Sequence, residues 1–200
     1  MKNPKKKAAR RSFRIPSWLI ALGVLAVLIV IPWLLLSEPA TSSSPGVAVS
    51  PTVQWTPLVS QQHGFRITLP APPQDLTPPM DLAREIDSTW TALYTGGTFM
   101  VKVTKCPEKV CTQAPDSVLK GMSESIREGL GGTTLSEKRV EVTCPHGSCP
   151  GLEFEATASQ GFKVSARIFA THDKIFQLMG TQFSGSDENF RKTVDSFSFL

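Results

Sequence analysis

The sequence lacks the short motifs that mark several large classes of enzyme. It contains no Gly-x-Ser-x-Gly elbow, no Cys-x-x-Cys pair and no phosphate-binding glycine loop. Gly129, Gly131 and Gly132 lie at the C-terminal end of a predicted helix, where the helix dipole repels anions. No internal repeat is present. The sequence therefore identifies no catalytic residue and no cofactor-binding residue, and it indicates no cofactor.

Acidic residues are absent from the chain before Glu38, whereas seven of its 21 basic residues lie there. These seven are Lys2, Lys5, Lys6, Lys7, Arg10, Arg11 and Arg14. Setting them aside leaves 14 basic residues against 17 acidic ones, a net charge of −3, although the whole chain carries +4. The pI near 9.0 thus reflects a basic tail, and we expect no nucleic-acid partner.

Ionisable residues are also missing from residues 16–36, PSWLIALGVLAVLIVIPWLLL. As a helix this segment is roughly 30 Å long, the thickness of the hydrocarbon core of a bilayer. Trp18 and Trp33 lie near its ends, where indole rings favour the membrane interface. Because the positive charges all precede the segment, the positive-inside rule places residues 1–15 in the cytoplasm. The sequence predicts a single-pass protein of a bacterial inner membrane, with its C-terminal domain on the periplasmic, extracytoplasmic side.

A cleaved secretory signal is the alternative for this segment. The apolar run exceeds the roughly 7–15 residues of a signal peptide, and the candidate cleavage triplet Glu38-Pro39-Ala40 has an acid where a small residue is needed. We therefore expect an uncleaved anchor. Residues 37–57, rich in Ser, Thr and Pro, are expected to form an extended tether to a domain at residues 58–200.

Apolar periodicity predicts an α+β domain. Residues 63–70 alternate as a strand, residues 88–105 indicate a hairpin about Gly96-Gly97, and helical spacing predicts a helix from Pro115 to Leu130. Strands follow at 135–143, 152–158, 162–170 and 175–180, with a connection at 144–151. A final helix capped by Ser186 and a C-terminal closure of the core by Phe197, Phe199 and Leu200 complete the expected order.

The hairpin around Ser159-Gln160-Gly161 allows a prediction of register. With Gly161 left-handed, Glu153 lies opposite Arg167, while Phe154 meets Ala166 on the other face. The apolar pairs Leu152–Ile168 and Ala156–Val164 follow from the same register. A single register thus satisfies a charged face and an apolar face.

Several segments resemble the C-terminal half of small PsbP-like domains of bacterial envelope proteins. They are GGTTLSEKRVEV, PGLEFEA, ARIFATHDKIFQLMG and NFRKTVDSFSFL. The resemblance covers roughly residues 60–200 and implies the fold of the photosystem extrinsic protein PsbP and of Mog, an antiparallel sheet sandwiched between helices. Such domains mostly serve as accessory or binding modules, so the resemblance implies no catalytic residue.

Four cysteines form two similar motifs, Cys106 to Cys111 and Cys144 to Cys149. On the extracytoplasmic side an even number of cysteines indicates disulfides, and we expect each motif to close locally. Crossed disulfides and a four-cysteine zinc site are the alternatives, although structural zinc usually takes tighter Cys-x-x-Cys pairs. We therefore predict no metal site.

Histidines 63, 146 and 172 each lie in a predicted turn. His146 as a metal ligand and His172-Asp173 as part of a hydrolytic triad are the functional interpretations, and a solvated turn residue is the simpler one. Glu153, Glu155, Lys163 and Arg167 form a possible charged surface for a partner, although such cross-strand pairs commonly only keep a strand soluble.

The sequence as a whole indicates a membrane-anchored, non-enzymatic accessory or protein-binding module. Its expected partners are the membrane, through residues 16–36, and a protein of the cell envelope. A small hydrolytic enzyme with a scattered site and a carrier of an apolar ligand remain the alternatives. A cleft with converging polar groups would favour the enzyme, and an apolar cavity would favour the carrier.

Overall fold

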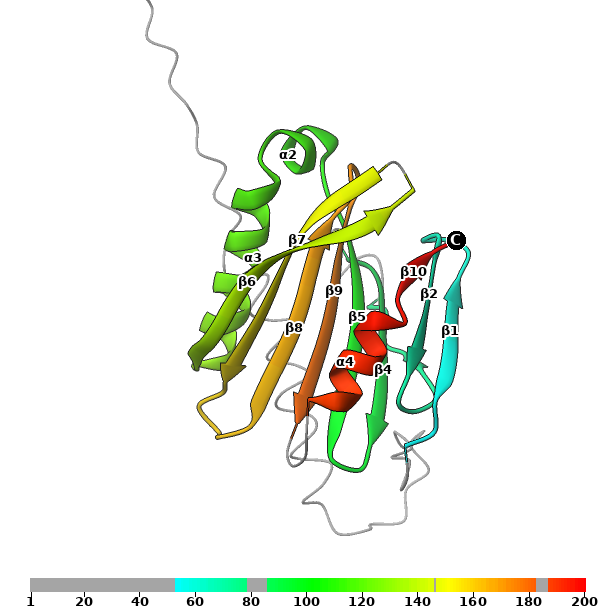
Figure 1. Cartoon of the computed structure of the whole chain (residues 1–200), viewed down its shortest axis with the longest axis vertical. Coiled ribbons are helices and arrows are strands. Elements are labelled where there is room, and N and C mark those ends of the chain that lie inside the picture. Colours follow the sequence, from blue (N-terminus) through cyan, green and yellow to red (C-terminus); the bar gives the residue numbers. More distant parts are fainter. Residues whose placement is uncertain (1–52, 79–85, 146, 183–186) are drawn as a thin grey trace, which may run out of the picture.

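A seven-stranded antiparallel sheet forms the middle layer of the computed structural model, which describes residues 53–78, 86–145, 147–182 and 187–200 (Figure 1). Its strand order is β3-β4-β5-β9-β8-β7-β6. The strands are β3 (Gln74–Asp75), β4 (Ile86–Tyr94), β5 (Gly97–Lys105), β6 (Thr133–Cys144), β7 (Gly147–Thr157), β8 (Lys163–Ala170) and β9 (Lys174–Gln182). The strands predicted after residue 86 all take part in this sheet.

Helix α3 (Pro115–Leu130) packs on one face of the sheet, mainly against β7 and β8. Its residues Leu119, Ile126 and Leu130 are buried because their spacing places them on one side of the helix. Pro115 occupies the first turn, and Gly131 ends the helix in the left-handed conformation with φ 58°. Both predicted ends of this helix are confirmed.

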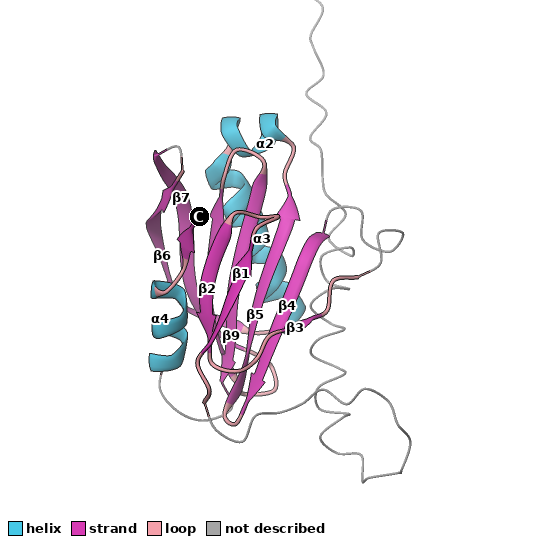
Figure 2. Cartoon of the chain, turned by 90° about the vertical axis from the view of Figure 1, so that its right-hand side faces the viewer, coloured by secondary structure: helices cyan, strands magenta, loops and turns pink. Residues whose placement is uncertain are grey.

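The opposite face is covered by a second, three-stranded sheet and by helix α4 (Glu188–Asp195). The small sheet has the order β1-β2-β10, from β1 (Thr56–Ser60), β2 (Phe65–Leu69) and β10 (Ser198–Phe199). Figure 2 shows β1 and β2 in front of the large sheet and α3 behind it. The prediction of helices on both faces of the sheet is thus correct for the face that α3 covers. The other face is covered mostly by the small sheet, with α4 as its one helix among the described residues.

Strand β1 begins inside the segment that the sequence assigns to the tether, residues 37–57. Its register with β2 runs from Thr56 opposite Leu69 to Ser60 opposite Phe65. Trp55 also packs against the domain, since its ring lies 4.1 Å from Nζ of Lys192 on α4. The sequence of β1, TPLVS, has too little alternation to indicate a strand, and it is the pairing with β2 that orders it.

The predicted β7–β8 register is confirmed. Glu153 lies opposite Arg167 and Phe154 opposite Ala166, and Gly161 has φ 85° as the three-residue loop requires. The backbone N–H of Ala158 donates to the carbonyl oxygen of Phe162 at 2.9 Å and closes the loop.

Three other details differ from the sequence predictions. The β4–β5 turn is formed by Thr95 and Gly96, because Gly97 already pairs with Tyr94 in the strand. Most of the connection predicted at 144–151 belongs to strands, since β6 ends at Cys144 and β7 begins at Gly147, and a short helix, α2 (Glu108–Gln113), occupies the first cysteine motif. Leu200 is 54% exposed and therefore does not close the core, since only Phe197 and Phe199 turn inward.

Some predictions concern residues outside the described part of the chain. The membrane segment 16–36, Ser186 and His146 all lie there, and helix α4 has Asp187 at its N-cap position. In the described ranges, every helix is too short or too polar to cross a bilayer.

Candidate functional site: an aromatic pocket beside the C-terminus

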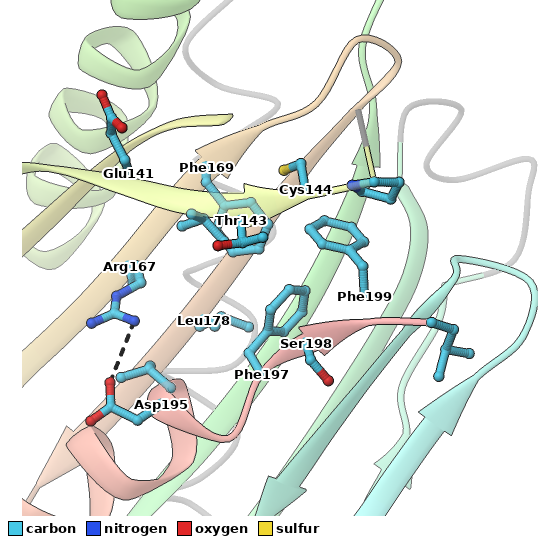
Figure 3. A pocket seen from close by; sticks show the side chains of 14 residues that line it. Glu141, Thr143, Cys144, Arg167, Phe169, Leu178, Asp195, Phe197, Ser198 and Phe199 are labelled. Atoms are coloured by element: carbon cyan, nitrogen blue, oxygen red, sulfur yellow. Dashed lines mark ion pairs between the residues drawn. The ribbon is translucent and has the colours of Figure 1, made fainter. Parts of the chain in front are cut away.

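The C-terminal segment and the outer half of the β6–β7 hairpin enclose a pocket of about 480 Å³ (Figure 3). Its floor consists of buried side chains of the large sheet and of α4, Phe169, Leu178 and Val194. Its walls carry the half-buried rings of Phe197 and Phe199. The pocket is thus a continuation of the core that opens at the surface.

The aromatic rings of the pocket contact one another edge to face. The rings of Phe169 and Phe197 are 5.0 Å apart at 68°, and those of Phe197 and Phe199 are 5.2 Å apart at 88°. Each such pair contributes about 0.5–1.5 kcal/mol beyond the area it buries. This packing holds the walls of the pocket in fixed positions.

Pairing with β2 fixes the C-terminal segment that carries these rings. Phe199 lies opposite Phe65 in the small sheet, and the hydroxyl of Ser196 accepts a hydrogen bond of 2.8 Å from the backbone N–H of Thr68. The N–H of Leu200 also donates to the carbonyl oxygen of Gly64 at 2.9 Å. The segment is therefore held along its length, and the pocket is pre-formed.

Charged side chains lie at one end of the pocket. Figure 3 shows Arg167 and Asp195 facing each other, with 3.7 Å between Nη1 and Oδ1. Arg167 also donates from Nε and Nη2 to Oε2 of Glu153, at 2.9 and 2.7 Å. The guanidinium is thus held between two carboxylates, one from the sheet and one from α4.

The structure brings together all four residues of the predicted charged surface. Lys163 pairs with Glu155 at 3.1 Å, next to the Arg167–Glu153 pair. Unlike a solvated strand face, the group is half-buried, with 15% of the Glu153 side chain and 22% of the Arg167 side chain exposed. Lys163 also binds Asp187 of α4 at 2.6 Å. Docking of α4 on this face was not predicted, and it places the charged group at the rim of the pocket, which Arg167 and Asp195 line.

The electrostatics of this rim are balanced by these contacts. Burial by itself raises the pKa of Glu153, but hydrogen bonds from Arg167 and Lys138 outweigh burial and leave that pKa below its usual value. The pKa of Lys163 is raised, chiefly by its hydrogen bond to Asp187. Both groups are therefore held in their charged forms, a state that favours structural pairing over proton transfer.

The predicted local disulfides are both formed. Cys106 bonds Cys111 and Cys144 bonds Cys149, with Cα atoms 6.1 and 5.9 Å apart. The first pair is buried beside α3. The second closes the end of the β6–β7 hairpin, and Cys144 lines the pocket, so this disulfide supports one wall of it.

The two described histidines lie apart from the pocket. His63 is buried, contrary to the solvated turn that we predicted, with Nε2 at 2.8 Å from the hydroxyl of Ser88 and its ring against Trp90. Burial lowers the pKa of His63. His172 lies 3.6 Å from Asp173 in an exposed turn. Within the described ranges, no three His, Cys, Asp or Glu side chains gather as a metal site requires.

Sequence reasoning assigned Phe197 and Phe199 to the core and missed the pocket that opens beside them. The alternation of Phe197 and Phe199 with two serines, directly after the final helix, was the available signal, because alternation indicates a strand with one apolar face. What it did not reveal was which elements face those rings.

Comparison with known proteins identifies the fold. No protein-family model matches the sequence, and no curated protein matches it significantly. The solution structure of cyanobacterial PsbP (CyanoP) from Synechocystis sp. PCC 6803 is similar, with a TM-score of 0.54 and 10% identity over 82% of this chain and 99% of that chain. A crystal structure from Bacteroides thetaiotaomicron VPI-5482 has a TM-score of 0.42 and 12% identity over 74% of this chain and 49% of that one. The chain therefore has a PsbP-like fold, as its C-terminal segments predicted.

Proposed function

We propose that the protein is a membrane-anchored accessory module whose extracytoplasmic domain binds a protein partner through the aromatic pocket. The observation that carries this proposal is the pre-formed pocket with Phe197 and Phe199 on its walls and the Arg167–Asp195 pair at one end. Binding energy at protein interfaces is concentrated in aromatic and Arg anchors in such pockets, surrounded by a polar rim. Residues 16–36 would hold the domain near its partner at a bacterial inner membrane.

A non-enzymatic role agrees with the chemistry of the rim. Each charged side chain of the group around Arg167 is paired with an opposite charge, and the pKa directions of Glu153 and Lys163 both favour the charged forms. A general acid or base works best with a pKa near the ambient pH, and these groups are shifted away from it.

Site-specific photocrosslinking in cells tests the proposal. A photoreactive residue at Leu200, which is 54% exposed and lines the pocket, is expected to yield one dominant protein adduct. The same residue at Val59, 52% exposed on β1, is the matched control and should not yield it. Phe199→Ala should remove the Leu200 adduct while the level of folded protein is retained. Equal adducts from both positions, or an adduct unaffected by Phe199→Ala, would refute the proposed interface.

A second candidate function is transport or storage of an apolar ligand. The volume of about 480 Å³ falls within the range of small-molecule sites, and the floor of Phe169, Leu178 and Val194 is apolar. Titration of the purified protein with an apolar fluorescent probe tests it. Saturable binding at one site that Leu178→Trp blocks would favour the carrier, since the larger side chain fills the floor of the pocket.

A further inference from the structure

The face of the large sheet that carries α3 has a polar region on β4, β5 and β9. Met100 of β5 and Met179 of β9 pack in the cluster under α3, so alternate residues of these strands point to the same side. Lys102 and Gln177 therefore share that face and lie directly opposite each other. Thr89 is the opposite neighbour of Lys102 on β4. A row of three polar side chains thus crosses three adjacent strands on the side away from the aromatic pocket.

Two more hydroxyl groups flank this row. Thr104 follows Lys102 by two residues on β5, and Thr91 follows Thr89 by two residues on β4, so both lie on the same face. Because β4 and β5 are antiparallel, the two hydroxyls lie on opposite sides of the row, and only Thr104 neighbours Gln177 as well as Lys102. Residues on adjacent strands of one face are about 4.5–5.5 Å apart when opposite and about 7–8 Å apart on the diagonal. Long side chains such as those of Lys102 and Gln177 reach across these distances.

Three buried polar atoms of this region have no hydrogen-bond partner. They are Nε2 of Gln177, Oγ1 of Thr91 and Oγ1 of Thr104. Gln177 and Thr91 are each only 3% exposed, so water does not generally satisfy them. Because buried polar groups in folded proteins are almost always paired, several unpaired ones on a single sheet face indicate an absent partner.

Lys102 also lacks a counter-charge among the described residues. It is half-buried, and no ion pair joins its ammonium to a described carboxylate. Burial lowers the pKa of Lys102, and no neighbouring acid offsets the effect. Lys105, three residues further along β5, is in contrast 66% exposed and paired with Asp87 at 3.1 Å.

We propose that Lys102, Gln177 and Thr104 form a binding site for a small oxyanion, a carboxylate or a phosphate group. The ammonium, the amide NH₂ and the hydroxyl of Thr104 can all donate hydrogen bonds, and an oxyanion accepts several donors at once. Its negative charge would compensate Lys102, which no described acid does. This site lies on the opposite face of the sheet from the aromatic pocket and is independent of the function proposed for that pocket.

Thermal unfolding of the full-length protein in detergent, followed by Trp fluorescence, tests the site. The midpoint is measured against the concentration of inorganic phosphate, of succinate and of chloride, at constant ionic strength. A ligand that binds only the folded state raises the midpoint in a saturable way. We expect phosphate or succinate to do so and chloride not to. The anion that raises the midpoint at the lower concentration shows whether the site favours a phosphate or a carboxylate group.

Variants show whether the effect comes from Lys102. Lys102→Met should abolish the shift, whereas the matched control Lys105→Met should retain it. Gln177→Leu should raise the half-saturating concentration by about tenfold, because it removes one donor to a charged ligand. If Lys102→Met fails to unfold cooperatively, the response of the Gln177→Leu variant to phosphate and succinate tests the site instead. The proposal is overturned if all three salts give the same midpoint in the wild-type protein, or if Lys102→Met or Gln177→Leu responds as the wild type does.

Discussion

Replacing Phe154 or Glu153 by alanine probes the two faces of β7 at adjacent positions. Phe154 is 1% exposed and belongs to the cluster beneath α3, whereas Glu153 points to the opposite face and bonds Arg167 and Lys138. Their side chains differ in environment but share the same strand and hairpin. The pair therefore compares loss of apolar packing with loss of a half-buried ion pair.

The expected costs differ in size because the mechanisms differ. Phe154→Ala removes a buried ring and leaves a cavity between the sheet and α3, so it should lower the free energy of unfolding by about 3–5 kcal/mol. Glu153→Ala leaves Arg167 with Asp195 and with some access to water, since 22% of the Arg167 side chain is exposed. We expect a loss of about 1–2 kcal/mol, above the value for an exposed surface pair because Glu153 is largely covered.

Urea unfolding followed by Trp fluorescence measures both costs. The m value should stay unchanged in each variant, so that the shift in midpoint reports stability alone. The control is Glu137→Ala, an exposed position on the edge strand β6, which should change stability by less than about 0.5 kcal/mol. Equal costs for Glu153→Ala and Phe154→Ala, or a larger cost for Glu153→Ala, would contradict the assignment of the two faces.

Three further predictions concern the charged rim, the cysteines and the membrane segment. The pKa of Glu153 is below its usual value of 4.5, so the stability difference between wild type and Glu153→Gln should be complete above pH 4.5. It should shrink as the pH falls through the folded-state pKa, and a constant difference down to pH 2 would contradict this linkage. Peptide mapping without reduction should recover Cys106 joined to Cys111 and Cys144 joined to Cys149 in the protein isolated from cells, and four free thiols with bound zinc would refute it. Protease added to intact spheroplasts should digest residues 37–200 and leave a membrane fragment with the original N-terminus, whereas a soluble form beginning near Thr41 would show a cleaved signal peptide.

Local sequence patterns determined much of the large sheet and its helix. The ends of α3 follow from Pro115, from apolar residues at helical spacing and from Gly131, all of which act within a few residues. The β7–β8 register follows in the same way from one short loop, because only one pairing places both Phe154 and Glu153 on suitable faces. Closure of each cysteine motif is local as well, with the two cysteines five positions apart.

The tertiary structure alone decided the second sheet and the pocket. Strand β1 and the C-terminal strand β10 are ordered by pairing with β2, and Ser198 lies opposite Arg66 at a great distance along the chain. No periodicity in either segment encodes that partner. The pocket depends on the same non-local pairing, which places Phe197 and Phe199 against Phe169 of the large sheet, and the charged rim depends on where α4 docks. The sequence alone determined which residues turn inward along strands such as β7 and β8, because side-chain alternation is local, but only the packing of distant elements decided which of these residues meet.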